Sequence, residues 1–347
     1  MRFYSGNHRY YCGVDLHART MYLCLTDHQG TVRLHERVDC TPEAFLEAVE
    51  PYTDDLVVCA ECIFCWYWLA DLCAAHNITF ILAHALYLKA IHGAKTKNDR
   101  IDSETLVVLL RGGSIPYAYV YPPAMRATRD LLRRRLFFTR KRSELLTHVR
   151  NTFHQYNLPA PKGTLLTQKS RVQIPACFDD PIVRTSVEAD LELSAAYDGI
   201  IRDLEKTVRR QAGTHDAHSL HVLQTTPGIG RILGLTILYE IHTIDRFPRV
   251  QDFSSYARLV KATRESAGKR VGTGGAKMGN AHLKWAYSEA AVCFLHNNPR
   301  GKQHIKRLRN RYGKGKALSI LAAKLGRANY FMLKQKRAFD MDRFFPN

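Results

Sequence analysis

The stretch that decides the fold is YYCGVDL at residues 10–16, which alternates with the period of two that is typical of a β-strand. Cys12 and Val14 fall on one side of such a strand, and Asp15 falls on the other side. An acidic side chain is seldom placed within an apolar strand unless it has a partner. The run therefore predicts a buried strand that carries a functional carboxylate.

The elements around this strand can be read from apolar period and turn residues. Two more strands are expected at 20–26 and 31–38, and then a helix at 41–50 that begins with an N-cap and a first-turn proline. The remaining elements are expected as a strand at 56–60, a helix at 66–76, a strand at 78–82 and a helix at 99–110. The order β-β-β-α-β-α-β-α is that of ribonuclease H-like α/β folds, in which the first strand and the next parallel strand are neighbours.

Four carboxylates lie near the ends of these expected elements. Glu61 closes the strand at 56–60, and Asp99 and Asp102 lie three residues apart on one face of the last helix. Because neighbouring parallel strands end at the same edge of a sheet, Asp15 is expected beside Glu61, and all four acids are expected to share one metal site. Crowded carboxylates repel one another unless a cation neutralises them, and oxygen ligands favour Mg²⁺, with Mn²⁺ as a substitute. The pattern predicts a metal site suited to phosphoryl transfer. The alternative is a helix cap and ordinary surface acids.

The composition indicates a polyanionic partner. The 347 residues include 51 Lys and Arg against 32 Asp and Glu, which gives a net charge of +19. Residues 126–150 hold nine basic and two acidic side chains, and residues 300–347 hold fourteen and two. Such blocks displace counterions from phosphates, so we expect nucleic-acid binding that weakens with salt. Arg133, Arg134 and Arg135 are candidate contacts, although solvated helix faces are the alternative.

The chain divides into three expected domains. Residues 1–120 form the α/β metal-binding domain, 121–215 a helical connector, and 216–347 a mainly α C-terminal domain with a basic tail. Apolar residues recur at helical spacing on both sides of a proline-rich tip at about 159–181, so the connector is expected to form two coiled-coil arms. Each arm must pack its apolar stripe on the other arm or on a second subunit.

Two motifs of the C-terminal domain are candidate nucleic-acid contacts. The run PGIG at 227–230 has the form of a helix-hairpin-helix turn, in which Gly228 and Gly230 let backbone N–H groups approach a phosphate, or of a plain tight turn. Residues 263–280 are expected to form an exposed, glycine-rich loop around Ser266. Taken alone, this is an ordinary loop serine. The cations of this loop are Arg264, Lys269, Arg270 and Lys277.

Together, these motifs resemble one family. The N-terminal part resembles the RuvC-like domain of DEDD-type insertion-sequence transposases, the family numbered one-ten with its eleven-eleven branch. This part of the resemblance rests on GVDLH at 13–17, AE at 60–61 and KNDRID at 97–102. The C-terminal part resembles that family's second domain through TPGIG at 226–230, Phe247, YA at 256–257, SAGK at 266–269 and KMGN at 277–280.

The resemblance implies a DNA transposase or site-specific recombinase. In it, Ser266 attacks a DNA phosphodiester and forms a covalent phosphoserine link, while the DEDD acids hold Mg²⁺. These acids are Asp15, Glu61, Asp99 and Asp102. The resemblance also implies a homo-oligomer, a dimer or tetramer, in which the acids of one subunit can meet the serine of another. Its further partners are donor and target DNA and a structured non-coding bridge RNA from the element.

Two other functions stay open on the sequence alone. One is a RuvC-like endonuclease that hydrolyses DNA junctions, and the other is a non-catalytic nucleic-acid-binding scaffold. No apolar run is long enough to span a bilayer, so we expect no membrane partner and a cytoplasmic, nucleoid-associated place in a prokaryote. The nine cysteines are expected as reduced thiols, and none of the sixteen histidines is expected to be a ligand.

Overall fold

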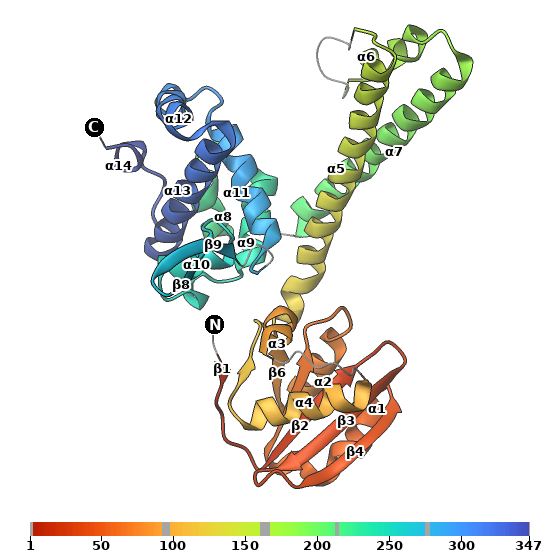
Figure 1. Ribbon diagram of the computed structural model, residues 1–347, viewed down its shortest axis with the longest axis vertical. Helices are drawn as coiled ribbons and strands as arrows, with labels where there is room; N and C mark the ends of the chain where they lie inside the picture. Colours follow the sequence, from red (N-terminus) through yellow and green to blue (C-terminus); the bar gives the residue numbers. More distant parts are fainter. Residues whose placement is uncertain (1–2, 92–97, 160–166, 212–214, 275–277, 347) are drawn as a thin grey trace. The chain divides into compact units, whose positions relative to one another are not determined.

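The computed structural model describes residues 3–91, 98–159, 167–211, 215–274 and 278–346 (Figure 1). Two compact units make up the chain, Met1–Ala124 and Met125–Asn347. Within the described residues, we find no helix with both the length and the apolar character that crossing a membrane requires.

A mixed five-stranded sheet forms the centre of the first unit. Its strands are β2 Tyr10–Leu16, β3 Thr20–Asp27, β4 Val32–Asp39, β5 Leu56–Glu61 and β6 Thr79–Ala83. They lie in the order β4-β3-β2-β5-β6, with β2, β3 and β4 antiparallel and β5 and β6 parallel to β2. The mixed α/β class predicted from the sequence is therefore confirmed, and β2 and β5 are neighbours as expected.

Helices cover both faces of this sheet. One face packs on α1 Pro42–Val49 and α2 Tyr67–Ala75, and the other on α3 Ala85–Ile91 and α4 Asp99–Arg111. A 3-10 helix, Glu50–Asp55, precedes β5, and β1 Phe3–Tyr4 pairs with β7 Ile115–Pro116. The short elements α3, β1 and β7 were not expected from the sequence, because so few residues carry no readable period.

Gly13 allows α4 to lie directly on β2. A Cβ atom at this position would stand 2.3 Å from the carbonyl oxygen of Ser103 and 2.7 Å from the backbone nitrogen of Val107. Asp15 lies two residues beyond Gly13, about 6.6 Å along the strand, and Asp99 lies four residues before Ser103, about 6 Å along the helix. The contact of Gly13 with Ser103 therefore places Asp99 opposite Asp15.

The second unit contains two long helices, α5 Pro123–Gln155 and α7 Pro181–Gln211, with α6 Gln168–Gln173 and the 3-10 helix Pro175–Cys177 between them. The two long helices pack together through a small apolar cluster that includes Val149, Phe153 and Val187. Ion pairs add to this contact, with 2.6 Å between Arg135 and Glu205 and 2.5 Å between Arg142 and Asp198. The arms predicted from helical spacing thus pair with each other.

The rest of the second unit is a helical bundle with one β-hairpin. Its helices are α8 Ala217–Gln224, α9 Arg231–Ile241, the 3-10 helix Ile244–Arg246, α10 Val250–Tyr256, α11 Ala281–Phe294, α12 Pro299–Tyr312, α13 Lys314–Gln335 and α14 Met341–Phe344. The expectation of a loop at 263–280 was wrong for most of that segment, because β8 Ala262–Ser266 pairs with β9 Lys269–Gly274. Ala267 and Gly268, with φ of 50° and 71°, make the two-residue turn.

Replacing Gly13 by alanine tests the close approach of α4 to β2. Because the new methyl group would meet backbone atoms, which cannot rotate away, we expect Gly13→Ala to lower the free energy of unfolding by about 1–3 kcal/mol or more. The measurement is urea denaturation. Gly199→Ala is the matched control, since nothing lies within 4 Å of a Cβ atom there. In the middle of α7 it should stabilise by up to about 1 kcal/mol. Equal stability of the two variants would contradict the packing argument.

Candidate metal centre

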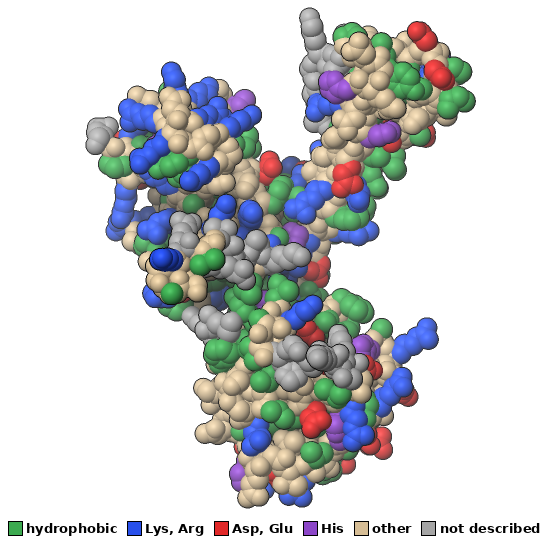
Figure 2. All heavy atoms as spheres, in the orientation of Figure 1, with side chains coloured by type: hydrophobic (Ala, Val, Ile, Leu, Met, Phe, Trp, Pro, Cys, Tyr) green, Lys and Arg blue, Asp and Glu red, His purple; other side chains and the backbone are tan. Residues whose placement is uncertain are grey.

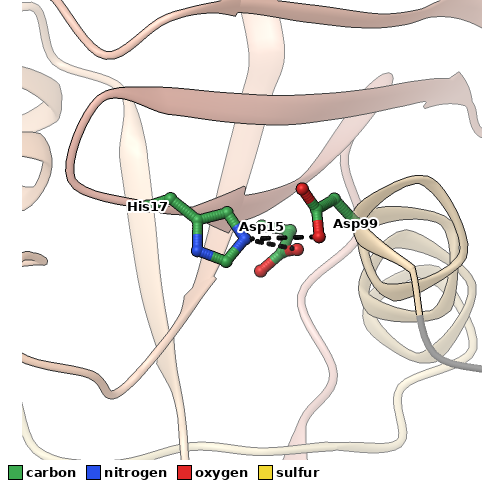
Figure 3. Close-up of side chains that lie close together, drawn as sticks. All are labelled: Asp15, His17 and Asp99. Atoms are coloured by element: carbon green, nitrogen blue, oxygen red, sulfur yellow. Dashed lines mark hydrogen bonds and ion pairs between the residues drawn. The ribbon is translucent and has the colours of Figure 1, made fainter.

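Three side chains converge where β2 ends and α4 begins (Figure 3). The Nε2 atom of His17 lies 3.2 Å from an oxygen of Asp15 and 3.5 Å from an oxygen of Asp99. One ligand atom from each of the three residues lies within 4.8 Å of the other two. Asp15 is the most enclosed, with 15% of its side chain exposed, whereas His17 and Asp99 are about half exposed at 50% and 54%. The cluster therefore opens to solvent on one side.

Local structure fixes each member of the cluster. Asp15 is held in the sheet, and His17 follows β2 in a turn where its N–H donates to the carbonyl of Thr20 at 3.1 Å. Helix α4 is capped by Asn98, whose side-chain oxygen accepts from the N–H of Ile101 at 2.9 Å. Because Asn98 is the cap, the carboxylate of Asp99 is not needed for that purpose and points toward Asp15.

The electrostatics of the cluster favour a cation. Burial raises the pKa of Asp15, and the negative charges of Asp99 and Asp102 raise it further, against a lowering effect of His17. A positive ion between the carboxylates would relieve this repulsion. The donors are mainly hard carboxylate oxygens, which fit Mg²⁺ or Mn²⁺, and the imidazole of His17 is more compatible with Mn²⁺ than with Mg²⁺.

The other two predicted acids lie close by but outside the tight cluster. Val14 of β2 pairs with Ala60 of β5, so Glu61 lies one residue past the last position of β5 that pairs with β2. Val57 and Cys59 lie on the face of the sheet that packs on α4. Because side chains alternate along a strand, Glu61 lies on that same face. Asp102 is near enough to influence the pKa of Asp15. The first unit thus brings all four acids to one region, with Asp15 and Asp99 in closest association.

His17 is a member of the cluster that sequence reasoning missed. The sequence analysis predicts no ligand role for any of the sixteen histidines. The signal that points to it is its separation of two residues from Asp15, which gives both side chains the same side of an extended chain. When protonated, the imidazole can pair with both carboxylates, and when neutral it can accept or donate one hydrogen bond.

Ser266 is placed at the end of β8, opposite Lys269 across the two-residue turn. Both residues are exposed. The backbones of Arg264 and Arg270 belong to the hairpin, but their side chains lie outside what the structure describes, as does all of Lys277. The predicted nucleophile is therefore at the exposed tip of a hairpin, with a lysine as its cross-strand partner.

The two glycines of the predicted helix-hairpin-helix turn have different surroundings. The turn does connect α8 to α9. Gly228, with φ of +86°, lies against α11, and a Cβ atom there would stand 2.4 Å from the backbone nitrogen of Phe294. Gly230 precedes α9 and has nothing within 4 Å of such an atom. Internal packing alone thus explains the glycine at 228, whereas position 230 has room for a ligand.

Two of the three predicted arginine contacts make ion pairs within the protein. Arg133 donates to the carboxylate of Glu240 at 2.6 and 2.9 Å, and Arg135 pairs with Glu205 at 2.6 Å. Arg134 is exposed, and its guanidinium carbon lies 4.6 Å from the ring centre of Phe137. The charge of Arg134 is therefore the one most available to a phosphate.

Glu240 is the centre of a buried polar network. It also accepts from Arg129 at 3.1 Å and from the side chain of Asn280 at 2.7 Å. Burial alone would raise the pKa of Glu240, but Arg133, Arg129 and Asn280 together lower it to about 2. This ionised group therefore stabilises the fold above its ordinary pKa of 4.5, and the stabilisation is lost as the pH falls toward 2. An acid in the apolar run ILYEI at 237–241 was a signal that sequence reasoning overlooked.

Comparison with known families covers both halves of the chain. Residues 12–158 match the model of the DEDD type from IS110 elements, described as "Transposase", and residues 220–306 match the model described as "Transposase IS116/IS110/IS902 family". The chain belongs to the IS110 family of DEDD transposases. The transposase for insertion sequence element IS1111A of Coxiella burnetii (strain RSA 493 / Nine Mile phase I) is 23% identical over 325 residues, which cover 90% of this chain and 86% of the relative.

Membership in this family defines the activity class. The protein is a DNA transposase, so DNA is its substrate. A DEDD transposase domain implies a ribonuclease H-like fold and dependence on a divalent metal ion, in agreement with the strand order and the acidic cluster described above.

Replacing Asp15 by asparagine should stabilise the metal-free protein. Because folding raises the pKa of Asp15 above 3.8, this carboxyl weakens the fold as the pH rises through that range. At neutral pH we expect Asp15→Asn to raise the melting temperature by roughly 1–3 °C without metal. Adding Mg²⁺ or Mn²⁺ should raise the melting temperature of the natural protein but not of this variant.

Glu104→Gln is the control, because it removes an exposed acid from the same helix α4. Its response to metal should equal that of the natural protein. If Asp15→Asn keeps the full metal-induced shift, the cluster is not the metal centre.

Proposed function

We propose that this transposase cuts and exchanges DNA strands by metal-dependent phosphoryl transfer with Ser266 as the nucleophile. The convergence of Asp15 and Asp99 at one edge of the sheet is the observation that carries this proposal. Asp15, Glu61, Asp99 and Asp102 are the proposed ligands of Mg²⁺, with Mn²⁺ as a substitute. When bound, such an ion would stabilise negative charge on the phosphate oxygens.

The hairpin β8–β9 supports the role of Ser266. An exposed hydroxyl at the tip of a narrow hairpin can reach a phosphodiester without steric hindrance from a wide loop. Lys269, directly across the turn, supplies a cation for the same phosphate. As the Oγ–P bond forms, the serine proton passes to a base and one P–O ester bond of the DNA breaks, so the DNA strand leaves with the departing oxygen. The product is a phosphoserine ester that a second DNA hydroxyl can attack in reverse.

The acids and the serine belong to different compact units. We therefore propose that the active site is assembled from two units, and that a homo-oligomer, a dimer or tetramer, combines the acids of one subunit with the serine of another. A structured non-coding RNA from the element is the proposed guide that pairs with donor and target DNA, as the family resemblance implies. A cytoplasmic, nucleoid-associated location is in keeping with these partners.

Ser266→Ala tests the nucleophile. Because no other atom would replace Oγ, we expect strand transfer to fall by at least about a thousandfold and the covalent protein–DNA adduct to disappear. The adduct is measured on denaturing gels with labelled donor and target DNA in Mg²⁺. Ser288→Ala is the matched control, since Ser288 is an exposed serine on α11 whose hydroxyl donates to the backbone carbonyl of Lys284 in its own helix at 2.8 Å.

Undiminished cleavage by Ser266→Ala would favour hydrolysis by water, as in a junction endonuclease. Asp102→Asn should eliminate activity in Mg²⁺ but spare DNA binding, whereas Glu104→Gln should leave both activity and DNA binding unchanged. A natural protein that is inactive under all these conditions would favour the scaffold function.

The guide RNA can be tested by purifying the protein from cells that carry the element and sequencing the bound RNA. We expect strong enrichment of one structured transcript from the element, and equal enrichment with Ser266→Ala, since binding does not need the nucleophile. A protein of similar charge purified in parallel controls for non-specific RNA. Absence of any enriched transcript would remove the RNA-guided part of the proposal and leave the catalytic part intact.

A further inference from the structure

Helix α12 presents cations to solvent in two separate rows. At 100° per residue, Lys306 and Arg309 lie within about 40° of Lys302 around the helix axis, and these three residues form the first row. Arg307 and Arg311 lie at about 140° and 180° from Lys302 and form the second row. All five side chains are exposed. Figure 2 shows Lys and Arg side chains gathered over α12 at the upper left of the view.

Two amide side chains lie between the rows. Gln303 and Asn310 fall at about 100° and 80° on the same scale, and both are exposed. The opposite side of the helix, at about 240–300°, carries Gly301, Ile305 and Leu308, which pack on the bundle core. The exposed face of α12 therefore consists of a central amide strip with a row of cations on each side.

The charge on this face is not neutralised by the helix itself. The sequence PRGKQHIKRLRNRY of α12 contains no acidic residue. Among the described residues, Arg300 pairs with Asp342 of α14, but none of the five cations of the two rows forms an ion pair with a described carboxylate. Lys314 and Lys316, which follow in α13, are also exposed and add to the positive field.

We propose that α12 enters the major groove of duplex DNA. A helix is about 10–12 Å wide and the major groove of B-DNA is about 12 Å wide, so α12 fits between the two phosphate strands. The two rows would then contact opposite strands, and Gln303 and Asn310 would meet the base edges. Glutamine and asparagine are suited to adenine, because each can bond to its N6 and N7 atoms together.

Duplex RNA does not offer the same fit. The major groove of A-form RNA is too narrow and deep for side chains of a helix to read, whereas that of B-DNA admits a helix. The spacing along α12 adds a quantitative expectation. Gln303 and Asn310 are seven residues apart, which is about 10.5 Å along the axis, or about three base pairs of DNA. This inference names the surface that holds DNA and does not depend on the catalytic roles of the acids and Ser266.

The first test measures the salt dependence of binding. The full chain is titrated against a labelled pool of random 25-base-pair DNA duplexes in EDTA, so that no metal-dependent cleavage occurs. For the triple variant Lys302→Gln, Lys306→Gln, Arg309→Gln, the slope of log affinity against log salt should become shallower by about 2–3, because each lost phosphate contact removes about 0.9. The same triple substitution should weaken the binding of duplex RNA of equal length at least about tenfold less than it weakens the binding of DNA.

The matched control is Arg202→Gln, Lys206→Gln, Arg210→Gln. These three exposed cations form a row on α7 with the same spacing of about one helical turn, so the control removes an equal charge from another helix. Thermal unfolding of both triple variants should match that of the natural protein, since the replaced side chains are all exposed. An unchanged slope for the α12 variant, an equal loss in the α7 control, or an equal loss of duplex RNA binding by the α12 variant would overturn the proposal.

The second test measures which bases are preferred. Selection of bound duplexes from the same pool should enrich adenine at positions about three base pairs apart. The double variant Gln303→Ala, Asn310→Ala should lose this preference and keep the salt slope, because it removes base contacts and leaves the two rows of cations. A preference that survives in the double variant, or no preference in the natural protein, would refute base reading by α12.

Discussion

The close contact between Gly13 and helix α4 is the constraint on which the candidate metal centre depends. Only a residue without a Cβ atom allows the backbone of Ser103 to approach β2 so closely. The approach fixes the height of α4 along the strand and hence the distance between Asp99 and Asp15. The carboxylate cluster of this ribonuclease H-like domain therefore depends on where α4 packs as much as on which acids the chain carries. The acids repel one another, so the packing of the helix must hold them together until a cation arrives.

The second unit has a comparable centre in Glu240. This buried carboxylate joins two arginines of α5 to Asn280, which caps α11 through hydrogen bonds to His282 and Leu283. Asn280 lies six residues after the end of the hairpin that carries Ser266. This network thus connects the first part of α5 and the start of α11, which follows the hairpin in the chain, to the same helix, α9. A buried charge with several good partners can supply this kind of specificity at little net gain in stability.

Much of the first unit could be predicted because its signals are local. The alternation around Asp15, the apolar run before Glu61 and the capped start of α4 each lie within a few residues, so the strand order and the acids followed from the sequence. For His17, the sequence shows only the nearby Asp15, whereas the second partner, Asp99, is 82 positions away. For the same reason the sequence indicates a nucleic-acid contact at Arg133, whose partner Glu240 is 107 residues distant. The hairpin at Ser266 is not recognisable in the sequence, because its turn is Ala-Gly and lacks the Asn-Gly or Asp-Gly pair that marks such turns.

The two-residue turn at Ala267 and Gly268 has a consequence for how far the serine can reach. The two strands are paired up to the two-residue turn, so the distance of the Ser266 hydroxyl from the base of the hairpin is set by the length of the strands. Lengthening both strands by one residue would carry it about 3.3 Å outward and turn it to the opposite face of the ribbon, whereas two residues would carry it about 6.6 Å and restore its facing. The reach of Ser266, the proposed nucleophile, therefore follows the strand repeat, and it can change with the facing of the hydroxyl preserved only in steps of two residues.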